Sequence, residues 1–124
     1  MARLDIAGAE LVLRLSALER LGAFVAGDAR VPLVAVRSAR AVPDPWAELR
    51  GIRAPGTGLS KVIALGTRRF PGGKDFAAVY GRGPAVVVDL AGVEFARLIV
   101  STEDAEGIAS EIESAARAAA LGQA

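Results

Sequence analysis

The chain contains neither cysteine nor histidine among its 124 residues. Without cysteine it can form no disulfide and offers no thiolate, and without histidine it lacks the commonest general base. These absences exclude Ser-His-Asp and Cys-His catalysis and the usual zinc sites. We therefore predict that the protein is not an enzyme and has no catalytic, cofactor-binding or metal-binding residues. A small enzyme using carboxylates and arginines alone is the least favoured alternative.

Long apolar runs are also missing. No stretch free of charged residues approaches the roughly 20 residues that a membrane-spanning helix needs. Charged residues interrupt the N-terminal stretch from Asp5 to Arg20, which is unlike a signal peptide. We therefore expect a cytoplasmic protein with no transmembrane segment. Peripheral contact with a membrane is an alternative that the sequence does not favour.

The net charge is only +1, which predicts no nucleic-acid partner. The charge is unevenly distributed: residues 28–100 carry eleven basic and six acidic side chains, whereas residues 101–124 carry five acidic side chains and one arginine. Acidic residues in the first turns of a helix are favoured by the helix dipole alone. The simplest interpretation is therefore an acidic helix beside a mildly basic sheet.

The composition is that of an ordinary globular protein, with 52% hydrophobic and 23% charged residues. A chain of this length fits one domain with a single core. In the second half, four apolar stretches are separated by Gly/Pro turns and precede an amphipathic helix from about residue 102 to 121, capped by Ser101 or Thr102. The predicted strands are 62–70, 76–80, 85–90 and 95–100, with hairpin signals at 71–73, 81–84 and 91–92.

The first half is less regular. We expect strands at 4–7, 10–15, 30–32 and 37–42, with a tight turn at 33–36. Ser16 and Glu19 fit a capping box, so a short helix should follow with Leu18, Leu21 and Val25 on its buried face; a hairpin is the alternative there. A helical turn is expected at 46–49, with Asp44 as its N-cap and Pro45 in its first turn. Residues 51–60 are predicted to form a long irregular loop.

Two glycine-rich stretches fail as phosphate-binding loops. Residues 51–56 have suitable glycine spacing, but Thr57-Gly58 follows where Lys-Ser/Thr is required, and Lys74 precedes a strand rather than a helix. The acidic residues of the sheet region fall mostly at turns and strand ends, which favours solvated side chains over a catalytic pair. These acids are Asp44, Glu48, Asp75, Asp89 and Glu94.

The candidate binding residues are basic or aromatic. Arg68, Lys74 and Arg82 belong to adjacent predicted strands and turns, and an outward Arg68 could join Lys74 at one rim and bind an anion. A solvated edge that blocks aggregation is the more ordinary interpretation. Arg53 and Thr57 of the predicted loop could contribute to the same surface. Trp46, the only tryptophan, would act as a lid over an open barrel end or as an exposed anchor for a partner.

The layout of the chain resembles bacterial pleckstrin-homology-like domains, in particular small uncharacterised proteins of actinobacterial type, over roughly residues 10–121. The stretches that carry the resemblance are 31–38, 43–46 with 49–53, 55–58, 64–67 with 73–76, 84–90 and 98–101 leading to Asp104. The resemblance implies an α+β fold that is mainly β, a single domain over 1–124. It would form a small barrel or two orthogonal antiparallel sheets, with the C-terminal helix across one corner. It implies no catalytic residues, because this superfamily is chiefly a binding scaffold.

The expected function is a binding module for protein interaction or self-assembly, and some bacterial relatives are similar in being oligomeric. The expected partner is an unidentified protein or a second copy of the chain. The alternative is a binder of an anionic small molecule or lipid headgroup. The basic cluster that lipid-binding relatives carry in their first hairpin is weak here, because Glu10 and Glu19 balance Arg14 and Arg20.

Overall fold

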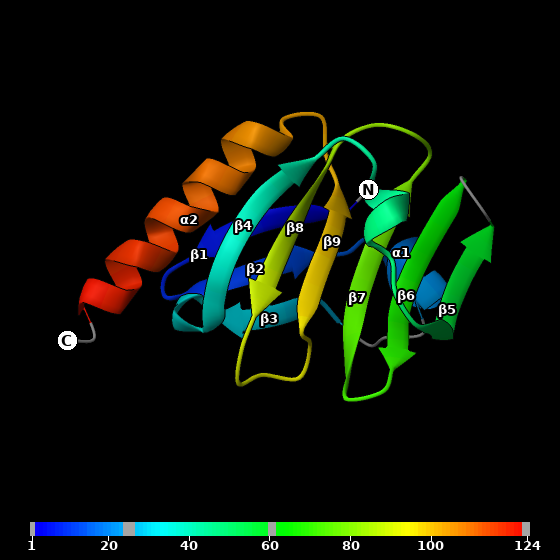
Figure 1. Ribbon diagram of the computed structural model, residues 1–124, viewed down its shortest axis with the longest axis horizontal. Helices are drawn as coiled ribbons and strands as arrows, with labels where there is room; N and C mark the ends of the chain where they lie inside the picture. Colours follow the sequence, from blue (N-terminus) through cyan, green and yellow to red (C-terminus); the bar gives the residue numbers. More distant parts are fainter. Residues whose placement is uncertain (1, 24–26, 60–61, 123–124) are drawn as a thin grey trace.

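The computed structural model describes residues 2–23, 27–59 and 62–122, with only the backbone given for 52–59. Their strands form two sheets, and a long C-terminal helix packs beside them (Figure 1). The smaller sheet has three antiparallel strands in chain order: β1 (Arg3–Ala7), β2 (Glu10–Arg14) and β3 (Ala29–Pro32). The helices are α1 (Ala17–Ala23), the single turns η1 (Leu33–Ala35) and η2 (Pro45–Glu48), and α2 (Ala105–Gly122).

The larger sheet contains six strands in the order β4-β8-β9-β7-β6-β5. Their bounds are β4 (Val36–Val42), β5 (Ile52–Leu59), β6 (Ile63–Phe70), β7 (Gly73–Tyr80), β8 (Ala85–Leu90) and β9 (Arg97–Ser101). The predicted mainly-β, α+β class with two sheets and a C-terminal helix is confirmed. In the described part of the chain the sheets stay open and form no closed barrel, and the smaller sheet crosses behind the larger one at a steep angle (Figure 1).

The strand order departs from the predicted succession of hairpins. β9 lies between β7 and β8 and runs parallel to β7, so the sheet is mixed rather than antiparallel. The predicted hairpin at 81–84 is therefore wrong, since β7 and β8 are not neighbours and these residues form a crossover. Leu98 and Ile99 point to opposite faces of β9 and are both fully buried. A strand without a polar face is stable only where both of its faces are covered, which is the centre of the sheet.

The predicted irregular loop at 51–60 is also wrong, because residues 52–59 form the edge strand β5. β5 pairs with β6 along its length, and the register shifts between Arg53 and Gly56. Pro55 falls within that shift. Proline has no backbone N–H and is tolerated in a sheet at an edge or a bulge, and β5 provides both. The Gly/Pro-rich composition thus marks a bulged edge strand rather than a long connection.

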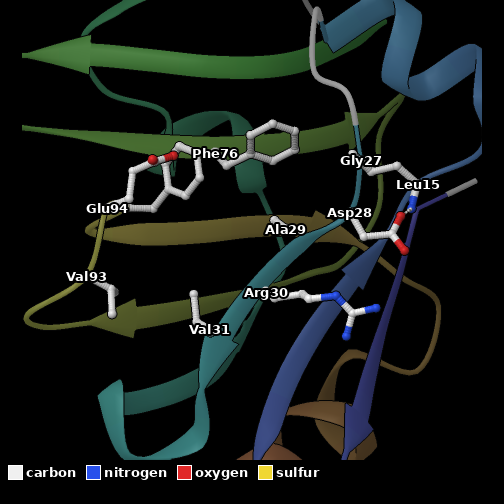
Figure 2. A pocket seen from close by; sticks show the side chains of 10 residues that line it. Leu15, Gly27, Asp28, Ala29, Arg30, Val31, Phe76, Val93 and Glu94 are labelled. Atoms are coloured by element: carbon white, nitrogen blue, oxygen red, sulfur yellow. Dashed lines mark hydrogen bonds between the residues drawn. The ribbon is translucent and has the colours of Figure 1, made fainter.

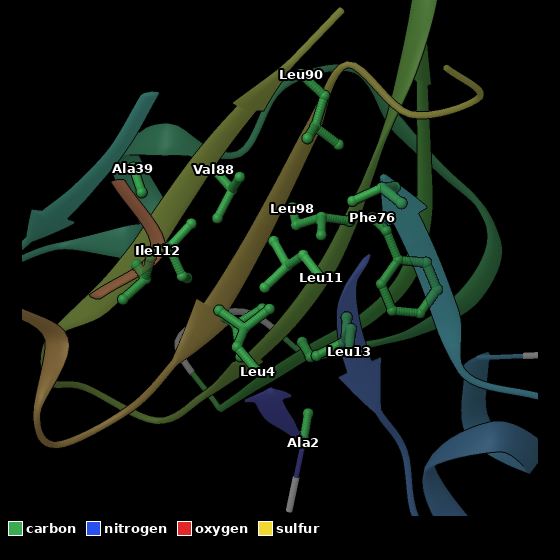
Figure 3. Close-up of a cluster of buried hydrophobic side chains, with 14 of the residues drawn as sticks. Ala2, Leu4, Leu11, Leu13, Ala39, Phe76, Val88, Leu90, Leu98 and Ile112 are labelled. Atoms are coloured by element: carbon green, nitrogen blue, oxygen red, sulfur yellow. The ribbon is translucent and has the colours of Figure 1, made fainter. Parts of the chain in front are cut away.

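Each face of the larger sheet buries a core. The principal core fills the space between the two sheets and α2, where Leu11, Phe76, Leu98 and Ile112 pack together (Figure 3). A second core lies on the outer face, where Val79, Val87 and Ile99 are fully buried. Trp46 and Leu49 pack on this second core. The short η2 segment therefore explains how the sheet can be apolar on both faces.

Helix α1 buries the face opposite to the one that the sequence predicted. The capping box is present: the Glu19 amide donates to Ser16 Oγ (3.2 Å), and the Ser16 amide donates to Glu19 Oε1 (2.8 Å). The Glu19 side chain is buried, however, whereas Leu18 and Leu21 are 80% and 72% exposed. Glu19 also accepts a hydrogen bond from the Tyr80 hydroxyl. These bonds turn the acidic face of this short helix inward, and Val25 lies outside the described residues.

Helix α2 begins later than predicted. Ser101 is the last residue of β9, and its Oγ accepts a hydrogen bond from the Tyr80 amide (2.9 Å). The helix starts at Ala105, and Asp104 Oδ1 accepts from the Gly107 amide at its N-terminus (3.3 Å). The predicted packed face is confirmed: Ala105 and Ile112 are buried, and Ile108, Ala115 and Ala119 pack against the core.

Candidate functional site

The outer face of the larger sheet carries a buried ion pair. The side chain of Asp75 on β7 is 0% exposed and accepts hydrogen bonds from Arg50 Nε (2.7 Å) and Nη2 (3.0 Å). The Arg50 guanidinium also lies 4.2 Å from the ring centre of Phe70. The hydrogen bonds to Asp75 raise the pKa of Arg50 above its ordinary value, although burial acts in the opposite direction. The pair fastens the segment just before β5 to the sheet.

A second group of charges joins η2 to the middle of the same face. Arg97 Nε donates to Asp89 Oδ1 (2.9 Å), and Arg40 Nη2 donates to Glu48 Oε1 (2.8 Å). Ser38 Oγ donates to Asp89 Oδ2 (2.8 Å). Four of the five acids that we expected to be solvated are therefore ion-paired: Asp75 and Asp89 on the sheet, Glu48 on η2, and the exposed Glu94 with Lys74. Alternation along the strands could have placed Asp75 and Asp89 on one face, but only the strand order brings the arginines to them.

The predicted basic rim is not assembled. In the antiparallel pair of β6 and β7, Arg68 lies opposite Asp75, and Arg69 lies opposite Lys74. Directly opposite residues share a face and successive residues alternate, so Arg68 and Lys74 point to opposite faces of the sheet. Arg68 donates to the carbonyl oxygens of Arg50 (3.2 Å) and Gly51 (3.1 Å). These bonds give Arg68 a structural role at the start of β5.

Lys74 lies on the inner side of the sheet, with its Nζ 3.6 Å from Glu94 and 5.3 Å from the ring centre of Phe95. Phe95 lines a cavity of about 310 Å³ between the sheets, together with Phe76, Val31, Asp28 and Arg30 (Figure 2). The Asp28 carboxylate is already engaged by the Leu15 amide (2.8 Å) and by Arg20 (3.0 Å). The polar groups at this cavity are thus largely used within the fold.

The fold brings two of the predicted binding residues, Trp46 and Arg82, together. They line one hollow of about 300 Å³ with Pro43, Asp44 and Gly83. The Trp46 indole Nε1 donates to the Gly81 carbonyl (2.8 Å), so the ring covers the outer core rather than a barrel end. Arg82 is exposed and forms no ion pair within the described residues. Arg53 and Thr57 belong to β5, but their side chains lie outside the described part of the structure.

A longer groove, which the sequence did not reveal, follows the β4 edge of the larger sheet, opposite the β5 edge. We define the β4–α2 groove as three adjoining hollows of about 180, 400 and 490 Å³ between β4 and the exposed flank of α2. Neighbouring hollows share lining residues, Glu113 and Arg117 in one case and Ala41 and Glu106 in the other. The groove therefore extends continuously along β4.

The edge of β4 in this groove is unpaired. β4 pairs with β8 on one side, and no other strand of the described chain lies on its other side. The Ala39 amide faces the groove and donates to the Glu113 carboxylate of α2 (3.4 Å). In sheets, such an amide usually donates to the carbonyl oxygen of a neighbouring strand. A side chain of α2 thus occupies the position that a further strand would take.

The two ends of the groove carry opposite charges. Glu103 and Glu106 are exposed at the end near Val42, and Arg37 and Arg117 are exposed at the end near Val36. None of these four side chains forms an ion pair with another described residue. The polarity of the groove was visible only in part from the sequence, which showed the acidic start of the helix but not the strand beside it.

Within the ranges described, no three potential metal-ligating side chains cluster together. None of the helices among those residues is long and apolar enough to cross a membrane. Comparison with models of known families, with curated proteins and with solved structures gives no match to this chain.

Proposed function

We propose that this chain is a protein-interaction module that associates by adding a strand to a free edge of its larger sheet. The partner is a second copy of the chain or an extended segment of another protein. The observation that carries the proposal is the unpaired edge of β4, whose Ala39 amide is bonded to a carboxylate of α2 rather than to a strand. Strand addition to such an edge is a recurring mode of protein recognition, in which main-chain hydrogen bonds supply affinity.

Two other features support association. Leu18 and Leu21 of α1 are largely exposed, and exposed apolar side chains lying close together are typical of interaction surfaces. The resemblance to bacterial pleckstrin-homology-like domains agrees with a binding scaffold, although the parallel pair of β7 and β9 departs from the antiparallel sheets that the resemblance implies. A cytoplasmic location belongs to the same proposal.

The first experiment is size-exclusion chromatography with light scattering, repeated over protein concentration and salt. A self-associating module should give about twice the chain mass of 12.7 kDa, with a dimer fraction that rises with concentration. A monomer at all concentrations would require a different protein partner, which affinity capture with the immobilised chain should recover. A monomer that captures nothing would refute the proposal.

The second candidate function is binding of an anionic small molecule or lipid headgroup. The observation that favours it is the hollow shared by Trp46 and exposed Arg82, whose guanidinium forms no ion pair among the described residues. Asp44 also lines this hollow, where its Oδ1 accepts from the Trp46 amide (3.1 Å). Inorganic phosphate and vesicles with anionic headgroups should then change the Trp46 fluorescence at low salt, and Arg82→Gln should abolish the change. Arg30→Gln, at an exposed arginine outside this hollow that pairs with Glu10 (3.5 Å), is the control for a general loss of positive charge.

A further inference from the structure

Building on this proposed function, we infer that the partner is a second copy of the chain, bound edge to edge through the β4–α2 groove. The two β4 strands would pair antiparallel about a two-fold axis near Ala39 and join the two six-stranded sheets into one. The two α2 helices would lie antiparallel on the same side of that joined sheet. The inference rests on the strand edges, the position of Glu113 and the charges along the groove.

The edge of β4 is better suited to strand addition than the edge of β5. β5 contains Pro55 within an irregular register, and proline at a sheet edge removes a donor and discourages pairing. β4 contains no proline, and its register with β8 is regular from Ser38 to Val42. Both strands end the sheet. The register of β4 also shifts, between Val36 and Ser38, but from Ser38 to Val42 its backbone groups follow one another without proline or interruption.

The backbone geometry at Ala39 matches a two-fold axis. Its amide faces away from β8, so Ala39 of two copies can form a hydrogen-bonded pair in which each residue donates to the other. Glu113 now accepts from this amide at 3.4 Å, a long hydrogen bond. The partner's carbonyl oxygen would replace the Glu113 carboxylate, which would then return to solvent. The exchange requires the exposed Glu113 side chain of each copy to move.

The charges of the groove are self-complementary in this arrangement. Antiparallel pairing places the end of β4 near Val42 beside the end near Val36 of the other copy. The acidic end of each groove, at Glu103 and Glu106, therefore meets the basic end of the other, at Arg37 and Arg117. A two-fold contact requires a surface that complements itself, and a groove with one acidic and one basic end meets that requirement.

The two-fold axis near Ala39 would also relate the two α2 helices. Ala39 is the middle residue of β4, and the side chain at its outer edge is Glu113, close to the middle of α2. Glu106 of one copy lies opposite Arg117 of the other when the antiparallel helix pair is centred near residues 111 and 112, just before Glu113. Ser110, Glu113 and Ser114 lie between them on the groove flank. The two serines are small, and the Glu113 carboxylate of each copy would have to turn away from the axis. Each dimer would therefore contain two Glu106–Arg117 ion pairs.

The test is a charge-reversal set measured by light scattering and by sedimentation equilibrium. Glu106→Arg places two arginines together at both symmetric positions, and Arg117→Glu places two glutamates together. Each should raise the dimer dissociation constant roughly 10-fold or more. Mixing the two variants should restore the dimer, because every Glu106–Arg117 position then holds opposite charges in one heterodimer. Glu111→Arg changes the net charge equally but lies outside the groove lining, so it should leave the mass unchanged.

Amide exchange gives a second readout that does not depend on these charges. The Ala39 and Ala41 amides should exchange more slowly as the dimer fraction rises, while amides of β5 should not change. This inference would be overturned if the chain dimerises but neither Glu106→Arg nor Arg117→Glu changes the dissociation constant, and the Ala39 amide is not protected from exchange. The proposed function would then still hold, since another surface would carry the contact. A strictly monomeric wild-type chain would also overturn it, and the proposed function would then depend on capture of a different protein.

Discussion

The buried pair of Arg50 and Asp75 gives the sharpest test of how the fold is held together. Replacing Arg50 by methionine keeps much of the side-chain volume but leaves the carboxylate of Asp75, which is 0% exposed, without its cation. Removing one member of a buried ion pair typically costs about 3–5 kcal/mol. Because the Arg50 side chain is 38% exposed, solvent should moderate the loss to about 2–4 kcal/mol.

The double variant Arg50→Met with Asp75→Leu separates charge from packing. It removes both ions together, and replacing a buried pair by apolar residues is often close to neutral. We therefore expect the double variant to recover most of the stability that the single variant loses. The contact of Arg50 with Phe70 is also lost in both variants, which leaves a residual cost of about 0.5–1 kcal/mol.

The assay is urea unfolding followed by circular dichroism and by the fluorescence of Trp46. The variants should lower the urea concentration at the midpoint of unfolding. The slope of the unfolding free energy against urea concentration should stay the same if the folded state stays compact. Arg14→Met is the matched control, because it breaks a partly exposed pair with Asp5 and should cost at most about 1 kcal/mol. A loss below about 0.5 kcal/mol for Arg50→Met would refute the reasoning, since it would mean that water compensates Asp75 in place of the arginine.

Two further predictions concern the start of β5 and the attachment of α1. Gly51 has φ +75°, and a Cβ there would lie 2.2 Å from the Arg69 carbonyl oxygen, so Gly51→Ala should cost at least about 2 kcal/mol in urea unfolding. Gly8→Ala, at φ +60° with open space around it, should cost only about 1 kcal/mol; equal losses would contradict the steric argument. Burial alone would raise the pKa of Glu19, but hydrogen bonds from the Ser16 amide and the Tyr80 hydroxyl outweigh it and lower the pKa. The free energy of folding gained from this lowered pKa is present above the pKa that Glu19 has in the unfolded chain, and it is lost as the pH falls through the pKa of Glu19 in the folded protein. Tyr80→Phe should therefore flatten the acid side of the stability–pH profile between about pH 5 and 3. An unchanged slope would show that the Tyr80 hydroxyl does not set the ionisation of Glu19.

Much of the local structure followed from the sequence because its signals act over a few residues. The capping box of Ser16 and Glu19, the helical turn after Asp44 and the apolar spacing of α2 are all present. Pro71 and Gly72 form the turn between β6 and β7, where Gly72 has φ +93°. In a type II turn a proline is followed by a residue of positive φ, so this dipeptide specifies its own geometry.

The sequence predictions were wrong where a contact with a distant segment of the chain decides the local structure. Residues 52–59 form a strand because β6 offers them hydrogen bonds, although their glycines and Pro55 favour a loop. Leu18 and Leu21 are exposed because Tyr80, some sixty residues away in the chain, binds Glu19 on the opposite face of α1. Periodicity alone identifies the apolar face of a helix but not whether a buried hydrogen bond turns that face outward.

The candidate site shows the same division. The sequence could identify Trp46 and Arg82 as candidates, and the fold brings them into one hollow. It also suggested that Arg68 and Lys74 act together, but the register of β6 and β7 places them on opposite faces. The β4–α2 groove involves residues more than sixty positions apart, and no local pattern relates them.

By itself, the sequence determined the α+β class, most of the strands and turns, the closing helix and the absence of histidine and cysteine chemistry. These properties depend on composition and on contacts between near neighbours in the chain. Only the tertiary structure decided that β9 lies between β7 and β8, that Asp75 is buried with Arg50, and that β4 keeps a free edge beside α2. Strand order is set by which apolar faces can be covered together, and that choice depends on the whole chain at once.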